Sequence, residues 1–163
     1  MENPQITSKN IQDIFENAQN DPSLFSNIDI EKLLDKIETD KNDYLENKSL
    51  ADISREIFDA IHSLENITHE QSVDYCKKLT GYRYVDSIHE LRMGKYTRWI
   101  RKDNAKLAIG SVLLNVKIDD DVQLMFKNNA NMYTVCKFDN FLIFQKLGVE
   151  EQLILMSYDY LHT

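Results

Sequence analysis

The residues whose types and spacing could do chemistry gather in one segment, Met93-Gly94-Lys95-Tyr96-Thr97-Arg98-Trp99-Ile100-Arg101-Lys102. It holds the single Trp of the chain, with an Arg on either side. A guanidinium group pairs with carboxylates or phosphates and stacks on aromatic rings. We therefore take the following residues as the candidate contact site: Lys95, Arg98, Trp99, Arg101 and Lys102.

Two interpretations of Trp99 are open, because residues 96–101 alternate like a strand. If Tyr96 and Ile100 point inward, Trp99 lies on the outer face and offers a binding platform. If Trp99 points inward, it anchors the core of a small domain. A lone Trp in a small domain usually has a packing role, which favours the core.

The other polar patterns do not predict a metal, a cofactor or a catalytic group. The Asp119-Asp120-Asp121 run lacks the spacing of a calcium loop and is typical of a hairpin tip. Gly94-Lys95 lacks the rest of a phosphate-binding loop, so Gly94 is expected to turn the chain with a positive φ. Zinc or thiol chemistry is not indicated, because the histidines and cysteines do not cluster: His62, His69, His89, His162, Cys76 and Cys136.

Charge is distributed unevenly along the chain. Residues 1–80 carry 8 Lys/Arg and 17 Asp/Glu, a net charge of −9, while residues 81–163 carry 11 and 10, a net +1. Within residues 92–106 six basic residues face only Asp103. A net charge of −8 argues against non-specific nucleic-acid binding. The basic strip can contact a phosphate or an acidic partner, or pair with the acidic helices of the chain itself.

Composition predicts a folded intracellular protein. Hydrophobic residues make up 42% of the chain, enough for a core, and no apolar run reaches the length of a membrane span. The first residues lack the pattern of a signal peptide, so secretion is not expected. Cys76 and Cys136 are therefore expected to be reduced and buried.

The acidic first half, residues 1–80, is predicted to be a helical region. Apolar residues recur at helical spacing in residues 8–20 and 30–37, and again from 49 to 64 after a cap at Ser49. A fourth helix begins at Thr68, where Gln71 completes a capping box. Its buried stripe is expected to contain Val73, Cys76, Lys77 and Leu79 or Thr80.

The second half, residues 81–163, is predicted to be a β-rich module with a terminal helix. Strands are expected at residues 96–101, 107–118, 122–126, 132–138 and 141–147, with a bend or bulge at Gly110 and a closing helix at 150–161. Short turns between them indicate an antiparallel meander. The predicted fold class is α+β: short amphipathic helices packed on a strongly curled sheet or small SH3- or Tudor-like barrel, closed by the C-terminal helix.

One string resembles a module found in uncharacterised proteins of large DNA viruses that infect amoebae. The matching residues lie within 86–161: Gly94-x-Tyr96-x-Arg98-Trp99-Ile100, Leu107 to Gly110, Phe138-Asp139, Phe144-Gln145-Lys146-Leu147, Glu151 and Ile154-Leu155. The resemblance implies a viral origin, a compact β-rich module and a role in the virion or the cytoplasmic viral factory. It carries no catalytic residue.

Together these features favour a non-enzymatic protein–protein interaction module with a viral or host protein as partner. Homodimerisation is a further expectation, because short edge strands often find cover in a second copy. A first alternative is a nucleic-acid-associated protein that uses the basic-aromatic strip of residues 92–106. A second is an enzyme without a recognisable motif, which would require a deep pocket with converging polar groups.

Overall fold

The computed structural model describes residues 43–162. They fall into two compact units, one containing residues 43–50 and 148–162 and the other residues 51–147. The helices expected at residues 8–20 and 30–37 lie outside the described residues. The expected division at residue 80 falls inside the second unit, where the last helix before the sheet is hydrogen-bonded to a loop of the sheet.

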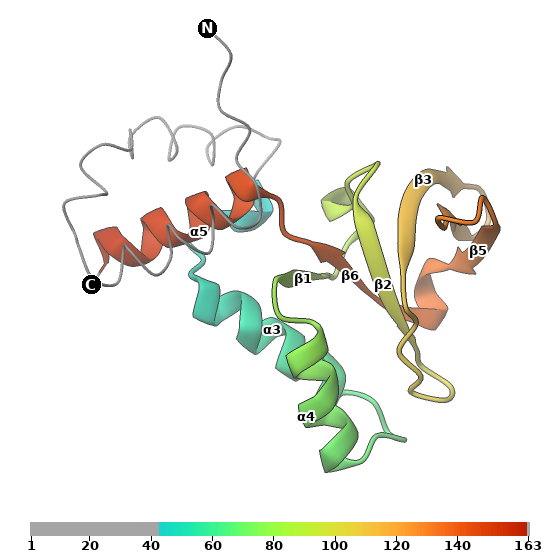
Figure 1. Ribbon diagram of the computed structural model, residues 1–163, viewed down its shortest axis with the longest axis horizontal. Coiled ribbons are helices and arrows are strands. Elements are labelled where there is room, and N and C mark those ends of the chain that lie inside the picture. The colour runs from blue at the N-terminus through green and yellow to red at the C-terminus, as the bar shows by residue number, and fades with distance from the viewer. Residues whose placement is uncertain (1–42, 163) are drawn as a thin grey trace, which may run out of the picture. The chain divides into compact units, whose positions relative to one another are not determined.

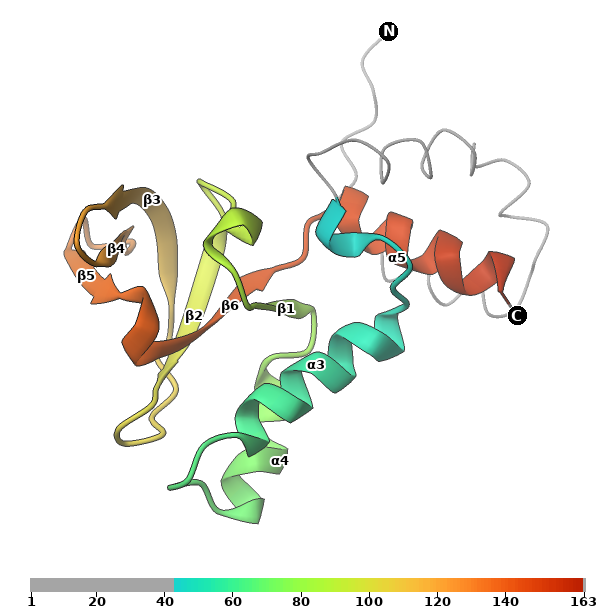
Figure 2. The ribbon, with the colours of Figure 1, turned by 180° about the vertical axis from the view of Figure 1, so that it is seen from behind.

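Two helices open the larger unit, α3 (Leu50–His62) and α4 (His69–Lys78). Figures 1 and 2 show them side by side. The expected stripe of α3 is confirmed, since its apolar members are all buried: Ile53, Ile57, Ala60, Ile61 and the following Leu64. The capping box of α4 is also confirmed, because the backbone N–H of Gln71 donates to Thr68 Oγ1 at 3.2 Å and the backbone N–H of Thr68 donates to Gln71 Oε1 at 3.1 Å.

The stripe predicted for α4 is confirmed only in part. Leu79 is buried as predicted and Cys76 is half-buried, but Val73 is 42% exposed, Lys77 is exposed, and Ser72 is buried instead. The helix is rotated toward Tyr75, whose hydroxyl donates a 2.8 Å hydrogen bond to the carbonyl of Ala105. A directed polar contact therefore selects the buried face of α4, which apolar spacing alone did not reveal.

The sheet of this unit has six antiparallel strands: β1 (Tyr82–Val85), β2 (Tyr96–Arg101), β3 (Ser111–Ile118), β4 (Val122–Lys127), β5 (Tyr133–Lys137) and β6 (Phe141–Lys146). Their order is β1-β6-β2-β3-β4-β5. The predicted α+β class is thus confirmed. No ladder joins β1 to β5 among these strands, so a closed barrel is not confirmed.

Three features of the sheet differ from the expected meander. Strands β2 to β5 follow one another as predicted, but β6 returns to pair with β2 and β1 instead of extending the row. β1 was not predicted at all. Its burial does not follow hydrophobicity, because the charged Arg83 is buried while Tyr82 and Tyr84 are only half-buried. β3 also begins at Ser111, four residues later than expected, and Leu107 makes only an isolated bridge with Ile100.

The inner face of the sheet carries a core to which every strand contributes. Its buried members are Val85, Trp99, Leu113, Leu124, Phe126, Cys136 and Ile143. A 3-10 helix, η4 (Phe138–Asn140), joins β5 to β6, and Phe138 and Phe141 pack against the same cluster. Burial of these side chains supplies the main favourable term for this unit.

A buried polar network joins β6 to its neighbours. The fully buried side chain of Gln145 makes the four hydrogen bonds that an amide can make. Its Oε1 accepts from the backbone N–H of Arg92 (2.8 Å) and from Nη2 of Arg83 (3.1 Å), and its Nε2 donates to the carbonyl of Arg92 (2.9 Å) and to Oγ1 of Thr97 (3.1 Å). Gln145 therefore holds β1, β2 and the segment before β2 in one arrangement.

The smaller unit contains the 3-10 helix η2 (Asp43–Leu45) and α5 (Val149–Leu161), close to the predicted closing helix. Glu151 of α5 is buried, and its carboxylate accepts from the Tyr44 hydroxyl at 2.7 Å and from the backbone N–H of Gly148 at 2.9 Å. Because α5 belongs to this unit, its closing of the sheet stays a prediction.

Gly110 provides a direct test of the packing between β2 and β3. Its φ is +110°, and a Cβ there would lie 2.8 Å from the carbonyl oxygen of Thr97. Gly81 is a matched control, with φ +86° but no atom within 4 Å of a Cβ. We expect Gly110→Ala to lower the free energy of unfolding by about 1–3 kcal/mol more than Gly81→Ala, because it adds a steric clash to the backbone strain. Urea denaturation of the two variants measures this difference, and equal losses would contradict the close approach.

Candidate functional site

Trp99 lies in the core and not on the surface. It is 9% exposed, and its ring stacks on Phe126 with centroids 4.4 Å apart. The core interpretation of Trp99 is therefore confirmed, and the alternative of an exposed binding platform is not. The alternation of β2 that puts Trp99 inward gives Arg101, two residues on, the same side of the strand.

The intrinsic fluorescence of the protein tests this burial, since Trp99 is the sole Trp. We expect a blue-shifted emission maximum and weak quenching by iodide, because the stacked ring is shielded from water and from the anion. A red-shifted, readily quenched emission would place Trp99 at the surface.

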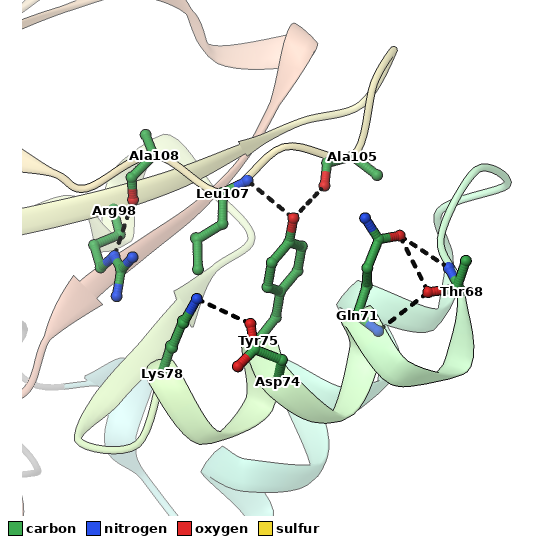
Figure 3. A network of polar contacts seen from close by, with 9 residues as sticks. All are labelled: Thr68, Gln71, Asp74, Tyr75, Lys78, Arg98, Ala105, Leu107 and Ala108. Carbon is green, nitrogen blue, oxygen red and sulfur yellow. Dashed lines mark hydrogen bonds and ion pairs between the residues drawn. The ribbon is translucent and has the colours of Figure 1, made fainter.

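The basic strip does not form one continuous surface. Arg98 is half-buried, and its Nε donates to the carbonyl of Ala108 at 2.9 Å (Figure 3). Lys95 is also half-buried, and its carbonyl accepts from the backbone N–H of Leu113 at 3.0 Å. Arg98 thus contacts the segment after β2, and Lys95 lies just before β2, beside β3. Arg101 and Lys102 are exposed at the far end of β2.

Arg101 and Lys102 line a surface pocket of about 440 Å³. One wall is the loop after β2, and the other is η4 with the first residue of β6. The lining residues are Arg101, Lys102, Asp103, Asp139, Asn140 and Phe141. The two walls are held together by a 3.1 Å hydrogen bond from the backbone N–H of Lys102 to the carbonyl of Asn140, and Arg101 pairs with Phe141 in the β2–β6 ladder. The two walls are far apart in the sequence, and the pairing of β2 with β6 brings them together.

The loop after β2 is held in place by hydrogen bonds from α4 and from the segment between α3 and α4. The hydroxyl of Tyr75 in α4 donates to the carbonyl of Ala105 and accepts from the backbone N–H of Leu107 at 3.4 Å, as Figure 3 shows. Asn66, between the helices, donates from Nδ2 to the carbonyl of Asp103 at 3.2 Å. Ala105 is buried with a positive φ of 53°, which closes the loop tightly. The pocket wall is therefore held by several contacts.

Arg101 is already engaged within the pocket. Its guanidinium donates from Nε and Nη2 to the two carboxylate oxygens of Asp103, at 3.1 and 2.8 Å. These hydrogen bonds lower the pKa of the Asp103 carboxyl. The guanidinium carbon also lies 5.9 Å from the centroid of the Phe141 ring, within reach of a cation–π contact. The positive charge of Arg101 is therefore already balanced by the Asp103 carboxylate.

Lys102 and Asp139 differ from Arg101, since neither makes a side-chain ion pair within residues 43–162. Both are exposed, one on each wall. An ammonium group donates three hydrogen bonds, and a carboxylate accepts several. The pocket therefore presents one unpaired charge of each sign beside the half-buried ring of Phe141.

No known protein family, curated protein or solved structure matches the chain. The pocket must therefore be interpreted from its own chemistry. Its lining contains no Ser, Cys or His, and the described residues contain no group of His, Cys, Asp or Glu that could hold a metal ion. Across the same part of the chain, no helix is long and apolar enough to cross a membrane. The arrangement is suited to recognition of polar and charged groups.

The two thiols lie apart from the pocket lining. Cys136 is buried on the inner face of β5, and desolvation raises the pKa of its thiol to about 11. Burial also raises the pKa of the half-buried Cys76. Both cysteines are free in the structure; Cys136 is buried as expected, whereas Cys76 is only half-buried. A raised pKa keeps a thiol protonated and poorly nucleophilic.

Alkylation by iodoacetamide tests the state of Cys136. At pH 8 we expect the folded protein to react at Cys136 more than about a hundredfold slower than the unfolded protein, because only the thiolate attacks and its fraction falls with the raised pKa. Peptide mass spectrometry separates this rate from that of Cys76. Equal rates at Cys136 in the folded and unfolded states would contradict its burial.

The candidate site predicted from sequence includes two of the six lining residues, Arg101 and Lys102, and misses the other four. Asp139, Asn140 and Phe141 are far from Arg101 in the chain, and no local pattern marks them as site residues. The sequence predicts residues 139–140 as the turn between two strands, and Phe138-Asp139 belongs to the resemblance, but neither places them in the candidate site. The pairing of β6 with β2 brings them to the site, and that pairing is not visible in alternation alone.

Proposed function

We propose that this chain is a non-enzymatic protein–protein interaction module, and that the pocket between the loop after β2 and η4 is its contact site. The observation that carries the proposal is the position of Lys102, Asp139 and Phe141 around one cavity of about 440 Å³. A peptide segment of a viral or host partner provides groups for all three: a carboxylate for Lys102, a basic side chain for Asp139 and an apolar side chain for Phe141. Two opposite charges on separate walls give the bound peptide a direction.

The proposal includes a curled, SH3-like form of the sheet. β5 and β6 are four strand positions apart in the sheet order, yet only the three residues of η4 join them. Four strand spacings of ~4.8 Å total ~19 Å in a flat sheet. Four residue steps at the ~2.0 Å rise of a 3-10 helix cover ~8 Å. The short connection therefore supports a strongly curled sheet in which η4 brings the Lys137 end of β5 near the start of β6, while β5 remains an edge strand.

A role in the virion or cytoplasmic factory of a large DNA virus that infects amoebae is also part of the proposal. Its support is the string Gly94-x-Tyr96-x-Arg98-Trp99-Ile100 with the later Phe144-Gln145-Lys146-Leu147. Several of these residues are buried: Trp99, Ile100, Phe144, Gln145 and Leu147. The string therefore marks the fold of the module and leaves the chemistry of the pocket to other residues.

Selection of peptides from a random display library on the full chain tests the contact site. We expect peptides with an acidic and a basic residue around an apolar residue to be enriched. Reversing either pocket charge, by Lys102→Glu or Asp139→Lys, should weaken their binding by about tenfold or more, because each replaces an attraction with a repulsion. Calorimetry with a synthetic selected peptide measures the affinity.

Lys106→Glu is the matched control for the charge reversal. Lys106 is exposed on the same loop but does not line the pocket, so this variant should bind the peptide within about twofold of the wild type. Equal losses in Lys106→Glu and Lys102→Glu would indicate a general charge effect. Peptides that bind all variants equally would contradict the pocket as the contact site.

A further inference from the structure

The strand β5 forms an edge of the sheet, with β4 as its one neighbour. Alternate backbone N–H and C=O groups of an edge strand point away from the sheet and can pair with another strand. In the described part of the chain, no group outside the β4–β5 ladder hydrogen-bonds to residues 133–136, while Lys137 at the end of the strand caps η4 and pairs with Asp121, with Nζ 3.4 Å from Oδ2. β5 therefore offers a row of backbone groups for pairing.

β5 has only part of the protection usual for an edge strand, a short length and one Lys at its end. Its sequence, Tyr-Thr-Val-Cys-Lys, has no Pro, and its ladder with β4 contains no bulge. Its β-branched and aromatic residues favour an extended chain. Tyr133 is 62% exposed and Val135 is 58% exposed. The opposite edge differs, because all four residues of β1 are buried or half-buried.

We propose that β5 pairs antiparallel with β5 of a second copy of this chain, about a twofold axis at Val135. This register sets Val135 opposite Val135 of the second copy, and Tyr133 opposite Lys137 twice. The β4–β5 ladder places Met125 beside Val135, so the pairing extends one apolar row across both copies. It goes beyond the pocket, which includes no residue of β5.

Charge selects this arrangement over a parallel one. Lys137 is the one charged residue of β5; it lies at the end of the strand, with its Nζ 3.4 Å from Oδ2 of Asp121. A parallel, in-register pair would set the two Lys137 ammonium groups side by side, which is unfavourable. The antiparallel pair separates the two Lys137 groups and places each beside the Tyr133 ring of the other copy. Within one chain this ring already lies 6.0 Å from Nζ of Lys127, at the distance of a cation–π contact.

The dimer is weak, because five paired residues bury far less than the ~1,200 Å² of a standard stable interface. Sedimentation velocity over a concentration series of the full chain therefore measures it. We expect reversible dimerisation at high concentration. Val135→Lys and Val135→Glu should each weaken the dimer by about tenfold, because like charges meet on the axis. Val135→Thr, which keeps the β-branch, should change it by less than about threefold.

The decisive result is the mixture of the two charged variants. Equimolar Val135→Lys and Val135→Glu should form a heterodimer at least as strong as the wild-type dimer, since residue 135 of one copy faces residue 135 of the other. Wild-type protein that remains monomeric, or a mixture without rescue while circular dichroism shows both variants folded, overturns the proposal. Lys102→Glu should dimerise as the wild type does, so failure of the pocket proposal and failure of this one are distinguishable.

Discussion

The amide of Gln145 is the contact on which much of the larger unit depends. It lies in the strand that separates β1 from β2, and its four hydrogen bonds reach both neighbours and the backbone of Arg92. A buried amide that loses a partner has no water to replace it, so the network strongly disfavours any shift of one strand relative to the next. The same fixed register of β6 determines where Phe141 meets Arg101, and thus where the pocket walls meet.

The parts of the fold that sequence could predict are those determined by neighbours in the chain. The capping box at Thr68 and Gln71, the apolar stripe of α3 and the hairpin turn at residues 119–121 all depend on contacts within a few residues. The position of β6 could not be predicted, because it depends on pairing between residues some forty to sixty positions apart. β1 was missed for a related reason: Arg83 is buried by partners that the local pattern does not contain.

The candidate site shows the same difference between local patterns and long-range strand pairing. The candidate contact site contains two residues that line the pocket, Arg101 and Lys102, but it groups them with Lys95, Arg98 and Trp99 because all five lie close in the chain. In the sheet, alternation sends Trp99 into the core, while Arg98 bonds the carbonyl of Ala108. The residues that complete the pocket, among them Asp139, come from the connection between β5 and β6. A local run of one charge is therefore a poor guide to a binding surface in a sheet.

The place of β6 in the sheet also determines when the strands can pair as the chain is synthesised. β1 is synthesised first of the six strands, but its one partner is the last. While the ribosome is still producing residues 86–140, β1 therefore has no strand to pair with, and neither does the β6-facing edge of β2. Pairings of such long sequence separation fold slowly, because a large loop must close before the contacts form. The nascent chain thus carries open strand edges until its last strand emerges, a period in which a chaperone would have the most to protect.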